Sequence, residues 1–402
     1  SLEMDFLLLI LKHRLSKDKN SLKLILMSAT LQEMMGNFYS NSELERFSRL
    51  NLDEPSLQEE NKQEKDPWDD LSQEDEELAS VWANAWNDSE PKLETYKPGI
   101  SNASNPFEIP FEDSVPTQKA GGSLFEVEIY YFKEVFEIVN SIPELYIADD
   151  FIQDYFQLDA SYQPEEVCPY LYEVASRLIL AQHQGGFKPE TKLGTFLVFL
   201  PGIQEINMMC DKLNEVSQET AESFDICLLH TSIPEEEHMK VLREPPPNKR
   251  RIILSTNIAE SSVTITDVRF IVDFGYSREV LFNSNTQSES LELKWSSKAE
   301  MKQRAGRAGR VAGGAVFRLM PEAFFEYKLY SFSQPEIQRC PLDKVVLKLK
   351  QMNLGHPEAV LSNAMQPPDS HEVAKTNRYL KEMGAINSSG EITNLGKLYA
   401  NM

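Results

Sequence analysis

Residues 195–202 read Thr-Phe-Leu-Val-Phe-Leu-Pro-Gly, a short uncharged run that stops at a Pro-Gly pair. Such a run, bounded by a turn signal, predicts a strand buried on both faces. The next residues, 203–216, have the spacing of a helix, so we expect a helix to follow the strand directly. A buried strand joined to a helix is typical of a parallel sheet that is covered by helices.

The same alternation of strands and helices extends outward from this stretch. It predicts helices over 6–15 and 170–183, and strands over 22–27, 124–132, 226–229, 251–254 and 270–274. From about Pro335 the pattern becomes helical, with expected helices over 345–352, 359–365 and 373–383 and a small hairpin at 384–393. Three helices and a hairpin indicate a winged-helix module. The predicted fold class is therefore α/β: a parallel sheet covered by helices, followed by a winged helix.

The 402 residues carry a formal net charge of −23, which excludes a uniformly basic nucleic-acid coat. Four cysteines without CxxC spacing argue against a zinc finger or a disulfide framework, and we expect no metal site in this chain. No apolar run approaches the ~18 residues that a membrane span needs. The chain begins without the basic and apolar regions of a signal peptide. These features predict a soluble intracellular protein without a membrane partner.

The acidic residues are concentrated in one stretch. Between residues 41 and 120 there are 20 Asp or Glu against 7 Lys or Arg, and the stretch becomes rich in Asn, Ser and Pro. Low apolar content with high net charge predicts a mostly disordered insertion. Trp82 and Trp86 are spaced for a short amphipathic helix, which either contacts its own domain or docks onto another protein.

The strongest local signal is the run Gln303-Arg304-Ala305-Gly306-Arg307-Ala308-Gly309-Arg310. On a helix, Gln303, Arg307 and Arg310 would share one face. Two guanidiniums bind the oxygens of a polyphosphate as planar forks, and an amide can orient a water molecule. The alternative is a solvated basic face, which Gly306 disfavours because glycine is a poor helix residue without a surface advantage.

Several short motifs occur together in the order and spacing of the DEAH/RHA superfamily-2 RNA helicases, which this chain resembles. They are Ser28-Ala29-Thr30, 199–202 (Phe-Leu-Pro-Gly), 229–232 (Leu-His-Thr-Ser), 255–260 (Ser-Thr-Asn-Ile-Ala-Glu) and 303–310. The resemblance extends to residues 335–342 and into the winged-helix region. Residues 257–264, 293–298 and 339–342 are most similar to the Tudor-domain-bearing helicases of the spindle-E type.

This resemblance implies roles for individual residues. Gln303 would position the attacking water, and Arg307 and Arg310 would be arginine fingers on the triphosphate. The remaining roles are coupling of hydrolysis to RNA movement (Ser28, Ala29, Thr30), contact with RNA phosphates (Gly202, Thr231, Ser232, Thr256, Asn257) and contact with the nucleotide (Leu242, Thr264, Thr266, Asp267, Gly306). The stretch 277–295 matches the strand-separating hairpin of the family.

Two positions depart from the family pattern. Thr266 followed by Asp267 stands where an Asp precedes a Gly, which puts the ribose contact in doubt. Leu242 stands where many relatives have an aromatic ring against the base.

Three further residues have a functional and a structural interpretation, and the structural one is at least as well supported for each: His230, Asp273 and Trp295.

The phosphate-binding loop and the Asp-Glu-x-His run of the family do not occur in these 402 residues. The expected organisation is a fragment: 1–40, the end of a first RecA-like domain; 41–122, the insertion; 123–160, the last strand of that domain and a linker; 161–334, a second RecA-like domain; 335–402, the start of the winged helix. The resemblance implies ATP and Mg²⁺ as cofactors, with the metal ligands mostly outside this chain.

The function implied is the C-terminal half of an ATP-dependent RNA helicase, acting on single-stranded or duplex RNA with 3′-to-5′ polarity. The spindle-E resemblance adds the germline piRNA pathway, meiosis, PIWI-type partner proteins and perinuclear granules of the cytoplasm (nuage). The alternative is a catalytically silent RNA-binding or scaffold module that works through its acidic insertion. The residues do not specify an oligomeric state.

Overall fold

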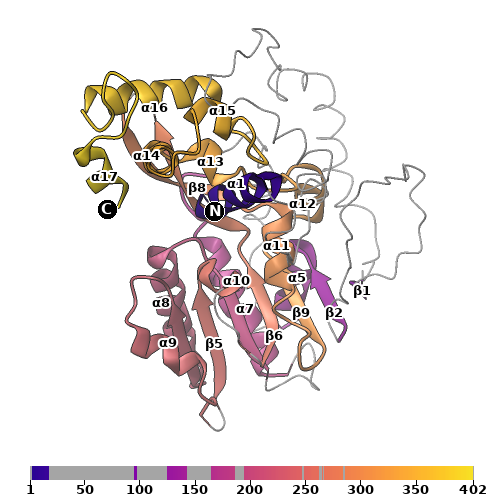
Figure 1. The fold of residues 1–402 in the computed structure, drawn as a ribbon. Coiled ribbons are helices and arrows are strands. Elements are labelled where there is room, and N and C mark those ends of the chain that lie inside the picture. Colours follow the sequence, from indigo (N-terminus) through magenta and orange to yellow (C-terminus); the bar gives the residue numbers. More distant parts are fainter. Residues whose placement is uncertain are drawn as a thin grey trace, which may run out of the picture.

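The computed structural model (Figure 1) describes residues 2–17, 95–96, 125–142, 164–185, 194–246, 249–261, 265, 267–283 and 286–401. Residues 18–40, which include Ser28, Ala29 and Thr30, lie outside this part. So does the acidic stretch, apart from residues 95–96, and with it the expected Trp82 and Trp86 helix.

A sheet of seven strands forms the centre of the chain, in the order β1-β2-β9-β6-β3-β5-β4. The six strands from β2 to β4 along this order run parallel, and β1 pairs with β2 in the antiparallel sense. The strands are β1 (Thr95–Tyr96), β2 (Val127–Tyr130), β3 (Thr195–Phe199), β4 (Phe224–Leu229), β5 (Arg250–Ser255), β6 (Val268–Asp273) and β9 (Gly314–Arg318). The predicted parallel sheet is therefore confirmed.

Helices cover both faces of this sheet because the side chains of its strands alternate between two apolar cores. Phe196, Val198 and the residues that share their side pack against one set of helices, while Leu197 and Phe199 face the other way. The first set is α5 (Phe132–Asn140), α7 (Tyr170–His183) and α8 (Ile203–Thr220). The second face receives residues from α9 (Glu235–Val241), α10 (Ile258–Ser261) and α11 (Lys298–Ala305).

The placement of β2 corrects one expectation. The strand predicted over 124–132 is not the last strand of a preceding domain, because β2 pairs along its whole length with β9, from Val127 opposite Gly314 to Tyr130 opposite Phe317. The helix that follows it, α5, packs on the same sheet. Residues 125–142 therefore belong to the same sheet domain as residues 194–320.

A hairpin, β7 (Tyr276–Asn283) with β8 (Ser288–Trp295), follows β6, as predicted for 277–295. The hairpin is followed by α11 and β9, and then by α12 (Glu322–Tyr327) and α13 (Glu336–Arg339). Arg339 links α13 to the hairpin, because its Nη1 donates to the Val280 carbonyl at 2.9 Å.

The C-terminal region contains the helices and the hairpin expected of a winged helix. Its elements are α14 (Asp343–Gln351), α15 (Pro357–Leu361), α16 (Ser370–Glu382), a β-bridge between Ile386 and Ile392, and α17 (Asn394–Ala400). The first helix of the chain, α1 (Leu2–Lys17), lies beside α13 (Figure 1). Its Phe6 and Leu9 join the core of the C-terminal region.

Candidate nucleotide and RNA site

Helix α11 carries Gln303 and is fixed at its first residue. Ser297 caps the helix: its Oγ accepts from the Glu300 N–H, and Glu300 in turn accepts from the Ser297 N–H at 2.7 Å. This reciprocal capping satisfies amides that would otherwise lack partners at the start of a helix. Because Ser297 lies two residues after the end of β8, the cap fixes the start of α11 at the base of the hairpin.

Arg304, the residue after Gln303, is the buried anchor of the helix. Its Nε lies 2.6 Å from Glu260 Oε1 and its Nη1 lies 2.8 Å from Asp273 Oδ1. Burial alone would lower the pKa of Arg304, but the two carboxylates outweigh it and raise that pKa, so the guanidinium stays charged. Arg304 therefore ties α11 to α10 and to the end of β6.

The helix ends at Ala305, so Arg307 and Arg310 do not share its face as predicted. The N–H of Arg307 bonds to the Arg304 carbonyl in a final turn, and Gly309 then adopts φ = +72°. This left-handed conformation is the physical reason for glycine here, because a side chain disfavours it. Gly309 also accepts from the Phe125 N–H at 3.2 Å, which attaches the turn to β2.

Arg307 and Arg310 nevertheless lie close enough to interact. The pKa of Arg307 is lowered, first by burial and then by the positive charge of Arg310, while Glu260 opposes the shift. Two guanidiniums that destabilise each other's charge are a favourable site for an anion, because a bound phosphate relieves the repulsion. These residues therefore fit the triphosphate that the sequence motif implies.

The predicted RNA-binding residues gather at one edge of the sheet. The three neighbouring parallel strands β3, β5 and β4 end in register at Phe199, Ser255 and Leu229. The segments that follow these ends contain Gly202, Thr256 and Asn257, and Thr231 and Ser232. The structure therefore brings all five together at the carboxyl edge, where α/β sheets bind ligands.

Two hydrogen-bonded contacts shape this edge. The N–H of Thr256 donates to the Leu229 carbonyl, which links the segments after β5 and β4. His230 Nδ1 lies 2.7 Å from Ser232 Oγ and accepts from the Ser232 N–H at 3.1 Å. His230 is thus a structural residue that holds this turn, while Thr231, Ser232 and Asn257 are exposed.

Gly202 lies at the start of α8, beside an ion pair. The carboxylate of the buried Glu205 accepts from Arg278 of β7 at 2.7 Å. A Cβ at Gly202 would come within 2.8 Å of Glu205 Oε2 and 3.0 Å of Arg278 Nε. The glycine therefore allows the hairpin to be tied closely to the carboxyl edge of the sheet. The sequence motifs did not indicate the Glu205–Arg278 pair.

The structural interpretation holds for Asp273 and Trp295 as well. Asp273 accepts from the Gly275 N–H at 2.9 Å in addition to Arg304, so it fixes the turn into the hairpin. Trp295 stacks on Tyr276 with ring centroids 4.2 Å apart and contacts Phe324. It is a packing residue at the base of the hairpin.

The expected nucleotide contacts are described only in part. Thr264 and Thr266 lie outside the described residues. Leu242 follows α9 and is 57% exposed, and Gly306 is exposed at the end of α11. Asp267 instead accepts a hydrogen bond from the Thr195 hydroxyl, so its carboxylate joins the amino ends of β6 and β3.

The sequence motifs missed the residues that hold this site together. Glu260 and Arg304 belong to quoted motifs, but no role was assigned to either of them. The signal that could have found them is a charge inside an otherwise apolar segment, since a buried charge requires a partner.

Among the described residues there is no group of three or more His, Cys, Asp or Glu side chains able to hold a metal ion. No described helix is long and apolar enough to cross a membrane.

The comparisons with known proteins agree with this geometry. Residues 183–312, which include α11 and the arginine run, match the helicase conserved C-terminal domain. Over 284 residues the chain is 37% identical to the probable ATP-dependent RNA helicase spindle-E of Aedes aegypti, covering 65% of this chain and 21% of that protein. It is 36% identical over 294 residues to the ATP-dependent RNA helicase TDRD9 of Mus musculus, covering 67% and 21%.

The chain therefore resembles the ATP-dependent RNA helicases of the spindle-E and TDRD9 type, as its motifs predict, and matches about a fifth of their length. A crystal structure of the Escherichia coli DExH-box NTPase HrpB aligns with 56% of this chain and 27% of that one, at 27% identity and a TM-score of 0.47.

Proposed function

We propose that this chain supplies the second half of the motor of an ATP-dependent RNA helicase, which hydrolyses ATP with Mg²⁺ and moves along RNA. One observation carries the proposal: Arg304 joins the arginine-bearing turn, through Glu260, to the segment that follows β5. The same segment begins with Thr256 and Asn257, the predicted RNA contacts. A single buried network thus connects the expected triphosphate side of the domain to its RNA side.

Each residue of this site has a defined part in the proposed reaction. Gln303 orients the attacking water, while Arg307 and Arg310 neutralise the charge that develops on the triphosphate. Such arginines typically contribute 10³–10⁵ in rate, because they act on charge that is largest in the transition state. Mg²⁺, when bound, would add charge neutralisation; its ligands are expected mostly outside this chain. Gly202, Thr231, Ser232 and Thr256 bind successive phosphates of the RNA strand.

The test uses the helicase that includes this chain, with Arg307→Ala and Arg310→Ala as separate variants. We expect RNA-stimulated ATP hydrolysis to fall by at least about a hundredfold, while the affinity for RNA changes less than about twofold. Lys302→Ala is the matched control, an exposed basic residue on α11, just before the turn that carries the two arginines. Equal losses of RNA affinity and hydrolysis would show that the run is a basic RNA patch, and full hydrolysis in both variants would show that neither arginine acts on the triphosphate.

We further propose that the helicase acts in the germline piRNA pathway, with PIWI-type partner proteins, in perinuclear cytoplasmic granules. The support is the similarity to spindle-E and TDRD9 helicases over two thirds of this chain. Immunoprecipitation of the tagged protein from gonads, followed by sequencing of small RNA and by mass spectrometry, tests this assignment. Absence of PIWI-type proteins and of piRNA precursors from the precipitate would contradict it.

A further inference from the structure

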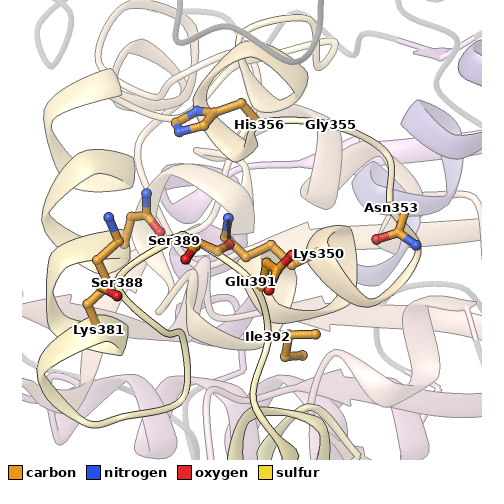
Figure 2. Close-up of a pocket in the computed structure, with 11 residues that line it drawn as sticks. Lys350, Asn353, Gly355, His356, Lys381, Ser388, Ser389, Glu391 and Ile392 are labelled. Carbon is orange, nitrogen blue, oxygen red and sulfur yellow. Dashed lines mark hydrogen bonds between the residues drawn. The ribbon is translucent and has the colours of Figure 1, made fainter.

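A polar pocket lies in the C-terminal region, away from the helicase site. It has a volume of about 550 Å³ and opens between the end of α14, the loop before α15, helix α16 and the turn at 388–391. Figure 2 shows Lys350 and Glu391 near its middle, His356 above them, Asn353 to the right and Lys381 to the left. Sites for small molecules occupy roughly 300–1,000 Å³, so this pocket is large enough to hold one.

The wall of the pocket contains an acceptor without a partner in the described part of the chain. Asn377 of α16 is only 8% exposed, and its Oδ1 makes no hydrogen bond there. The Nδ1 atom of His356 is likewise buried and unbonded. Burial lowers the pKa of His356, so its ring is neutral near pH 7. Buried polar atoms without partners are costly, and a ligand with hydroxyl donors would satisfy Asn377.

Two lysines, Lys350 and Lys381, line the pocket. Lys350 is half-buried, and its Nζ donates to the Gly390 carbonyl at 2.7 Å, which positions the ammonium in the wall. Burial and the charge of Lys381 both lower the pKa of Lys350, while Glu358 opposes them. Glu391 is the one carboxylate in the lining, and it is exposed and accepts from Asn387 Nδ2 at 3.3 Å. An anion between the two ammonium groups would relieve their repulsion.

These features select a class of ligand. An apolar molecule does not match a lining of lysine, asparagine, serine and histidine, and inorganic phosphate alone would leave Asn377 without a donor. We propose that this pocket binds a ribonucleotide unit, with its phosphate between Lys350 and Lys381 and the ribose 2′-hydroxyl donating to Oδ1 of Asn377. The unit is either a free nucleotide or part of an RNA strand, and only the second case rests on the proposed RNA-binding function.

The test measures binding of AMP, dAMP, inorganic phosphate and a ten-nucleotide oligo(U) RNA to the full chain by calorimetry. Three variants are compared with the wild type: Lys381→Gln, Asn377→Leu and, as a matched control on α14 outside the pocket, Lys344→Gln. Lys381 is exposed, so its variant keeps the fold even if Asn377→Leu weakens it. A thermal melt of each variant identifies any loss of folding.

We expect the ribonucleotide to bind about threefold more weakly after Lys381→Gln and about tenfold more weakly after Asn377→Leu, with no change after Lys344→Gln. Loss of AMP binding with unchanged RNA affinity would identify a free nucleotide as the ligand. Loss of RNA affinity would identify a unit of the strand. The proposal is overturned if the pocket variants bind both probes like the wild type, or if dAMP or phosphate binds as well as AMP. Absence of any RNA binding by the wild type would count against the proposed function. The AMP measurements would still test whether the pocket binds a ribonucleotide.

Discussion

Nη1 of Arg304 lies 2.8 Å from Oδ1 of Asp273, and neither side chain is more than 2% exposed. The same guanidinium binds Glu260, and Asp273 also accepts from the Gly275 N–H. A helix, the segment after β5 and the turn into the hairpin are therefore held by one buried cation. Because these charges are removed from water, removal of one leaves a buried charge without its partner.

Arg304→Met should destabilise the full chain by about 3–5 kcal/mol, because two buried carboxylates would lose their cation. Urea denaturation followed by circular dichroism measures this change. Lys302→Met on the same helix is the control, since Lys302 is exposed and should change stability by less than about 0.5 kcal/mol. A loss below about 1 kcal/mol for Arg304→Met would show that the network is not needed for stability.

The sequence predicted this fold well where the signal is local. The run at 195–199 and the helix after it were correct because apolar composition and a Pro-Gly turn determine them within a few residues. The partner of β2 was not predictable in this way, since β9 lies almost 190 residues later and periodicity does not specify which strands pair.

The candidate site was likewise predictable only where the sequence signal is local. Positions 303, 307 and 310 were predicted as functional from their residue types, and this stays a prediction, but their expected common helical face was wrong because Gly309 has a positive φ and the helix ends at Ala305. The contact of Arg304 with Asp273 joins residues 31 positions apart, and no spacing rule indicates it. Motifs identify the chemistry of single residues, whereas the buried pairs that position them emerge only from the fold.

The stability of the winged-helix region should depend on pH through His356. Burial lowers the pKa of this residue below its ordinary value of 6.5; Lys350 and Lys381 lower it further, and Glu358 opposes them. Between the two pKa values the unfolded chain binds a proton that the folded chain does not, so the free energy of unfolding falls as the pH drops below about 6.5. Thermal melts from pH 7.5 to pH 5, without nucleotide, measure this dependence.

His356→Gln should reduce this acid sensitivity, because the variant has no imidazole to protonate at this position. His371→Gln is the control, since its side chain is 81% exposed. If the His356 variant keeps the full pH dependence of the wild type, another group is responsible.

Deletion of residues 41–120 should leave the remaining protein folded and its RNA-stimulated ATP hydrolysis, in the helicase that includes this chain, within about twofold of the wild type. The composition of this stretch does not support a core. Its one described element, β1, contributes two residues at the edge of the sheet beside β2. Circular dichroism and steady-state hydrolysis test the deletion. An unfolded product would show that the stretch is structural.

The isolated 402-residue chain should not hydrolyse ATP at a useful rate. Phosphoryl transfer requires backbone amides and a lysine that cradle the triphosphate, together with a carboxylate-held Mg²⁺ that bridges its terminal oxygens. In the proposed site Gln303, Arg307 and Arg310 form only the opposite wall, which would orient water and neutralise charge but would not hold the substrate in place. The sequence contains no GxxxxGK[ST] loop to complete the site.

Weak RNA binding by the same chain should persist, because the carboxyl-edge residues Gly202, Thr231, Ser232 and Thr256 all lie in the folded sheet domain. It should weaken as salt rises, since phosphate contacts release counterions. For the first of these two expectations, the absence of useful turnover, steady-state ATP hydrolysis by the isolated chain with saturating RNA is the direct measurement. Turnover near the ~1–100 s⁻¹ of phosphoryl-transfer kinases would contradict the expectation that these residues supply only one side of the ATP site, because a complete active site would then have to lie within them.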